Sequence, residues 1–173
     1  MKKLSIMLLA LMLLAGSSTL KAQKAQKIGH IDFAELYSLM PGMDSAQQKY
    51  QDYAKTLKSQ LDAMQGEYDT KVADYQANVA TMPDLIKKNK EKEILDLQDR
   101  IQSFQQSAQE SLQKKEQELT EPIIEKARQA VKDVAKENSF TYVLNTADAL
   151  GVVLFFDNGE DIMALVKKKL NLK

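Results

Sequence analysis

The chain has 173 residues, no cysteine and no tryptophan, and its 24 basic residues balance its 24 acidic ones. The lack of cysteine excludes disulfides, and the balanced charge argues against a nucleic-acid-binding protein, which would carry a basic surface. The bias toward Gln, Lys, Glu, Ala and Leu, with few aromatic residues, is typical of long exposed helices.

Residues 1–22 have the layout of a secretory signal peptide. Lys2 and Lys3 are followed by an apolar run over residues 4–15 and then by small polar residues. The run is shorter than the roughly 20 apolar residues that a membrane-spanning helix needs. We therefore expect export from the cytoplasm and no stable membrane insertion. The best cleavage point is after Ala22, and because Leu20 is not small, other points between Ala15 and Ala25 are alternatives. Cleavage leaves 21 basic and 24 acidic residues, a net charge of −3.

The mature chain opens with a predicted strand and a short helical turn. Residues 27–33 alternate, with Gly29, Ile31 and Phe33 on one face. Residues 34–40 favour a short helix, which the Pro41-Gly42 pair ends.

The next 80 residues predict a two-helix hairpin. Apolar residues recur at steps of three and four, which is the spacing of a coiled-coil seam, and Pro83 separates two such stripes. The predicted turn lies at residues 80–84, with Thr81 as the cap of the second helix. Reflection of the sequence about residue 82 places Pro41-Gly42 opposite Pro122, so each arm would hold about 38 residues and span roughly 55 Å.

The C-terminal part changes character again. The second helix is predicted to continue past Pro122 and to end near Asn138-Ser139. Two strands follow, at 140–145 and at 151–156, and the second is continuously apolar, as a strand buried on both faces would be. Asn158 is the expected cap of a last helix over residues 160–170.

These elements predict an α+β fold in which the hairpin is inserted after the first strand. The signal peptide would be followed by a body segment at 23–43, an arm at 44–121 and a second body segment at 122–173. A sheet of three short strands has open edges and needs a partner, which self-association of the strands would supply. The candidate interface residues in these strands are Ile31, Phe33, Val143, Val153 and Phe155.

No catalytic, metal-binding or cofactor-binding constellation is present in the sequence. His30 is the only histidine, so a zinc site is not expected, and no Gly-rich phosphate loop indicates ATP binding. Residues 157–161 superficially resemble part of a calcium loop, but they lack its alternating ligand spacing and its distal Glu. We therefore expect a protein that is not an enzyme.

One charged cluster follows the predicted turn. Four lysines lie within six residues, interrupted only by Asn89 and Glu91. They could be an ordinary solvated face or a positive patch at the tip of the arm, and the sequence does not favour either interpretation. Together with nearby apolar residues they are the candidate contacts for a bound partner: Met82, Leu85, Ile86, Lys87, Lys88, Lys90 and Lys92.

The mature chain resembles the Skp/OmpH family of periplasmic chaperones. The resemblance is carried by the opening residues 27–33, by the Gln/Lys-rich hairpin, by residues 130–135 leading into 140–144, and by residues 160–167. It implies a periplasmic homotrimer with a small β-barrel body shared between three subunits, from which three hairpins surround a cavity. It also implies ATP-independent holding of unfolded outer-membrane β-barrel proteins.

The arms depart from the family pattern in their charge. The best-known members have strongly basic arms, whereas residues 44–83 carry four basic and six acidic residues and residues 84–121 carry seven and nine. Each arm is therefore net −2, and only the lysine cluster keeps a local positive charge. A periplasmic coiled-coil adaptor and a structural protein of the envelope are the alternative interpretations of the hairpin.

Overall fold

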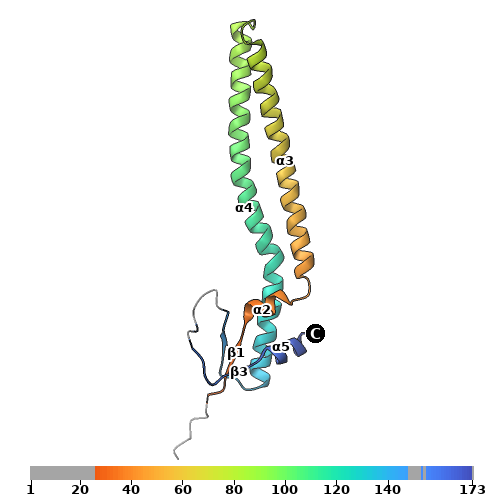
Figure 1. Cartoon of the computed structure of the whole chain (residues 1–173), viewed down its shortest axis with the longest axis vertical. Coiled ribbons are helices and arrows are strands. Elements are labelled where there is room, and N and C mark those ends of the chain that lie inside the picture. The colour runs from red at the N-terminus through yellow and green to blue at the C-terminus, as the bar shows by residue number, and fades with distance from the viewer. Residues whose placement is uncertain (1–25, 148–152, 154, 173) are drawn as a thin grey trace, which may run out of the picture.

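The computed structural model describes residues 26–147, 153 and 155–172, so the predicted signal peptide lies outside the described residues. The elements are β1 (Ile28–Ile31), α2 (Phe33–Ser38), α3 (Met43–Asn78), α4 (Asp84–Glu137), β2 (Tyr142–Asn145), β3 (Glu160–Asp161) and α5 (Met163–Lys169). The described chain is mostly helical and has a small sheet, which agrees with the predicted α+β fold class. Figure 1 shows α3 and α4 as a long hairpin that projects from a small body, which the other elements form around the lower end of α4.

The hairpin follows the predicted reflection about residue 82. Lys71 is paired with Glu93 and Asp74 with Lys90 across the two helices, and both pairs are centred on that residue. Farther down the arm, the buried side chains of Met64, Leu97 and Ile101 form a small core, here called the arm cluster. The partly buried side chains of Leu61, Tyr68 and Phe104 pack against the arm cluster.

The turn between the helices differs from the prediction. Pro83, in extended conformation, occupies the cap position of α4, and no side chain caps the helix there. The Thr81 hydroxyl instead donates a hydrogen bond to the carbonyl oxygen of Asn78, at 3.1 Å, and so satisfies a carbonyl at the C-terminal end of α3. The prediction that Thr81 caps α4 was wrong because the proline itself starts the helix: its missing N–H needs no partner at a helix start.

Helix α4 passes through Pro122 without ending, as expected, and stops after Glu137. Ser139 adopts the left-handed conformation, with a φ of 59°. The Phe140 N–H then donates to the Ala135 carbonyl at 2.9 Å. This arrangement is a Schellman motif, which satisfies free carbonyls at the end of the helix and turns the chain back toward the sheet.

The three strands form a parallel sheet in the order β2-β1-β3. Gly29 of β1 is buried because two side chains lie against its backbone. A Cβ atom added there would be 3.0 Å from Ile162 Cγ2 and 3.1 Å from Phe140 Cδ1. Strand β1 therefore joins segments that lie more than 100 residues away in the sequence, as the insertion of the hairpin predicted.

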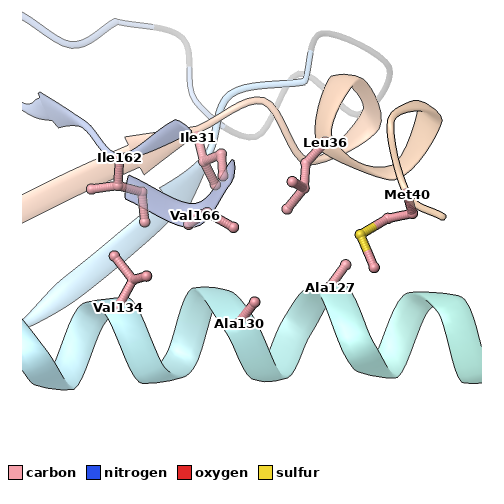
Figure 2. Close-up of a cluster of buried hydrophobic side chains, with 8 residues drawn as sticks. All are labelled: Ile31, Leu36, Met40, Ala127, Ala130, Val134, Ile162 and Val166. Carbon is pink, nitrogen blue, oxygen red and sulfur yellow. The ribbon is translucent and has the colours of Figure 1, made fainter. Parts of the chain in front are cut away.

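The core of the body lies between the sheet, the short helices and the lower part of α4 (Figure 2). Small side chains on α4 face the other elements, which allows the short helices to approach closely. The buried residues of this body cluster are Ile31, Leu36, Met40, Ala127, Ala130, Val134, Ile162 and Val166.

Two predictions for the C-terminal part were wrong. The described residues of the predicted strand at 151–156 are not in a strand, and Phe155 is 82% exposed rather than buried. The last helix begins at Met163, whose N–H donates to Asp161 Oδ1 at 2.8 Å, so Asn158 does not cap it. Glu160 and Asp161 are instead part of β3, because they pair with β1.

Candidate functional site

The tip of the arm exposes apolar side chains. Leu85 is 70% exposed and Ile86 is 43% exposed in the first turn of α4. Met82, in the turn itself, is half-buried. The fold of the single chain therefore leaves these three candidate contact residues at least partly available to a partner.

Two lysines of the predicted cluster form ion pairs in the folded chain, and two do not. Lys90 Nζ lies 2.7 Å from Asp74 Oδ2 across the hairpin, and Lys87 Nζ lies 3.9 Å from Asp84 Oδ1. Lys88 and Lys92 are exposed and form no ion pair with any residue that the structure describes. Only two of the four lysines therefore present an uncompensated charge.

Sequence analysis did not name the partner of Lys90. This partner is Asp74, which lies 16 residues away on the other helix, at the matching position of the reflection about residue 82. The hydrogen bond and charge of Lys90 lower the pKa of Asp74, and the same contact raises the pKa of Lys90. At the next residue of each helix, the Tyr75 hydroxyl donates to Glu91, and this hydrogen bond raises the pKa of Tyr75. These contacts fix the register of the two helices near the tip.

The middle of the arm has a shallow apolar groove between the helices. Its volume is about 370 Å³. It lies beside the arm cluster, where the seam between the helices is incompletely covered. Its apolar lining residues are Ala54, Leu57, Leu61, Phe104, Ala108 and Leu112. These residues belong to the two apolar stripes whose three–four spacing predicted the seam, and that spacing did not indicate that the seam stays open.

A second apolar groove, of about 400 Å³, lies in the body beside β2. Three of the candidate interface residues line this groove: Ile31, Phe33 and Val143. Ile31 itself is only 2% exposed and belongs to the body cluster, so it is covered within its own chain. Among the candidate interface residues outside the groove, Val153 is half-buried and Phe155 is largely exposed.

Other chemistry is sparse in the described part of the chain. Its residues include no group of three or more His, Cys, Asp or Glu side chains that could hold a metal ion. His30 packs its ring against Phe156, with 4.4 Å between the ring centroids. Of the helices that the structure describes, none is both long and apolar enough to cross a membrane.

Among the large apolar residues exposed on the two helices of the arm, Leu95 is the one that sequence analysis missed. It is 59% exposed on α4, although it lies between the seam residues Ile94 and Leu97 in sequence. The sequence contained a signal of this exposure. Leu95 follows the seam residue Ile94, and adjacent residues on a helix point about 100° apart, so Leu95 points away from the direction of Ile94.

Comparison with known proteins gives a consistent result. A family model described as outer membrane protein (OmpH-like) matches residues 27–170. The chain is 24% identical over 149 residues to the chaperone protein Skp of Photorhabdus luminescens, covering 86% of this chain and 88% of that protein. It is 26% identical over 126 residues to the Vibrio cholerae chaperone protein Skp, covering 73% and 75%. For the Pectobacterium atrosepticum chaperone protein Skp the values are 23% over 159 residues, covering 92% and 93%.

Proposed function

The chain belongs to the OmpH-like outer membrane protein family, and we propose that it is a periplasmic holdase chaperone for unfolded outer-membrane β-barrel proteins. Similarity to proteins named chaperone protein Skp supports this function. The signal-peptide pattern of residues 1–22 supports export. The chaperone works without ATP hydrolysis, in keeping with a sequence that has no phosphate-binding loop.

The observation that carries the proposal is the arm itself. Beyond its first turn, where Met43 packs against the body cluster, α3 stands clear of the body together with the matching part of α4 (Figure 1). The two helices leave apolar side chains and a groove exposed. Membrane-spanning β-strands alternate apolar and polar residues and are prone to aggregate before insertion. A surface that binds the unfolded state lowers its free concentration and so slows aggregation.

We further propose that three chains assemble through their bodies. Among the described residues the sheet has three strands, β2 lies at its edge, and an apolar groove runs beside that edge. An open edge with apolar surface next to it is a ready site for another chain. Phe33, Val143, Val153 and Phe155 supply the apolar contacts in this arrangement, and the arms then surround a shared cavity.

Turbidity measurements test the holdase function. A urea-unfolded outer-membrane β-barrel protein is diluted into buffer without ATP, with and without the mature chain starting at Gln23. We expect suppression of turbidity at a severalfold excess of the chaperone. An unchanged turbidity would remove the chaperone function and favour the adaptor interpretation.

A further inference from the structure

One face of α4 carries two leucines and two lysines that the fold of the chain does not use. Leu85, Lys88, Lys92 and Leu95 follow one another at steps of three, four and three residues. At 3.6 residues per turn, they lie within about 80° of one another on the side opposite the arm cluster. We call these four residues the outer stripe.

The outer stripe is both apolar and positively charged. Leu85 and Leu95 are 70% and 59% exposed. Lys88 and Lys92 are exposed and unpaired within the described part of the chain, whereas their neighbours Lys87 and Lys90 are engaged by acidic side chains. Like charges four residues apart destabilise a helix, and neither lysine forms an ion pair among the described residues that would offset this repulsion.

We propose that the outer stripe is the docking site for one class of partner, an extended unfolded polypeptide that carries apolar and acidic side chains. The proposal rests on the holdase function and names the part of the arm that first captures the client. The two leucines are ten residues apart, which is about 15 Å along a helix. Two apolar side chains four residues apart in an extended chain are separated by about 13 Å.

This spacing defines the recognised segment. Apolar residues at both ends of a five-residue stretch meet the leucines, and a carboxylate between them meets the two lysines. Because residues two apart lie on the same face of an extended chain, this carboxylate belongs to the middle residue of the five. Recognition therefore needs no fixed sequence, only an apolar–acidic–apolar pattern at this distance.

An anionic lipid surface is the other partner that exposed leucines and lysines could attract. Binding to such a surface takes about four to eight basic residues. The outer stripe supplies two unpaired lysines, and residues 84–121 are net negative, with seven basic and nine acidic residues. The net negative charge opposes any anionic partner, but two lysines are enough to pair with one carboxylate. The number of lysines therefore favours an acidic polypeptide segment over a lipid surface.

The test compares two double variants of the mature chain, with an acidic, urea-unfolded, fluorescently labelled outer-membrane β-barrel protein as the probe. L85A/L95A is expected to raise the dissociation rate about tenfold, because apolar contact area is lost. K88Q/K92Q is expected to lower the association rate severalfold at low salt, and the difference should disappear as salt screens the charges. The control K49Q/K55Q removes the same charge from α3 and should leave both rates unchanged.

The outcomes separate this proposal from the holdase function. Alanine favours helix at least as well as leucine, so circular dichroism should show the same helix content in every variant. If the wild-type chain holds the probe and both stripe variants keep its rates, the docking site is wrong and the holdase function stands. If the wild-type chain does not bind the probe, both proposals fail. Binding of the wild-type chain to anionic vesicles that L85A/L95A abolishes would identify lipid as the partner and overturn this inference.

Discussion

At the scale of single residues, the tip of the arm is held by exposed polar contacts between the helices. Lys90 donates to Asp74 and Lys71 donates to Glu93, at 2.7 and 3.0 Å. Exposed ion pairs contribute little to stability one by one, but they specify which residues face each other. Their main effect here is to divide the lysines into those used by the fold and those left for a partner.

The Asp74–Lys90 pair should make the stability of the arm depend on pH at both extremes. The pKa of Asp74 is lowered, so its contribution is complete above its ordinary value of 3.8 and is lost as pH falls through the lowered pKa. The pKa of Lys90 is raised, so its contribution is complete below 10.5 and is lost as pH rises through the raised pKa.

Thermal unfolding of wild type and K90Q, followed by circular dichroism, measures this contribution. Between those limits, K90Q should melt about 1–3 °C lower than wild type. The difference should shrink toward both extremes of pH. The matched variant K88Q removes a lysine with no ion pair among the described residues and should show no such pH-dependent loss. A K90Q difference that is constant from acid to alkali would contradict the ion pair.

At the scale of elements, the glycine that precedes the arm, Gly42, and the glycine within it, Gly66, have opposite roles. Gly42 caps the start of α3 with a φ of 99°, a conformation that side-chain-bearing residues rarely adopt. Gly66 lies within α3, and nothing lies within 4 Å of the position that a Cβ atom would take there. The first glycine is needed for the entry into the arm, and the second only weakens the helix.

Replacement of each glycine by alanine should therefore shift stability in opposite directions. G66A should raise the free energy of unfolding by about 0.5–1 kcal/mol, because alanine favours helix. G42A should lower it by about 1–2 kcal/mol. Its added Cβ would only touch Ile123 Cδ1 at 3.9 Å, so backbone strain and not crowding is the cause. Urea unfolding followed by circular dichroism measures both, and equal shifts would contradict this account of the entry into α3.

At the scale of the whole molecule, the arm and the body have separate cores. The arm cluster comprises Met64, Leu97 and Ile101, whereas the body cluster joins α4 to the sheet and the short helices. If the bodies drive assembly, the arm can be shortened without loss of the trimer. Residues 61–75 and 89–103 are matched segments of 15 residues about the turn, and their removal shortens the arm by about 22 Å.

Light scattering on the mature chain should give the mass of a trimer, both for the full-length arm and for this double deletion. A folded monomer of the full-length chain at micromolar concentration would contradict assembly through the bodies. A trimer for the full-length chain with dissociation of the deletion variant would show that the arms drive assembly instead.

The sequence was sufficient to predict the hairpin, because its determinants are local. The three–four spacing of apolar residues and the position of Pro83 specify two helices and the place where the chain returns. The continuation of α4 past Pro122 to Asn138 was predicted for the same reason, because the apolar positions persist beyond the proline. The opening strand was likewise evident from alternation around Gly29 and Ile31.

The details that the sequence did not determine depend on contacts between distant segments. Glu160 and Asp161 form β3 rather than the start of the last helix because β1 offers them an edge, and Lys27 pairs with Glu160 at 2.9 Å. Lys90 is neutralised because the return of the chain brings Asp74 to it, whereas Lys87 is paired with Asp84 on its own helix. Leu95 became a candidate contact only once the packed face of α4 was known. Helix periodicity is a property of neighbouring residues, whereas strand pairing and charge compensation require the positions of residues that only the folded chain brings together.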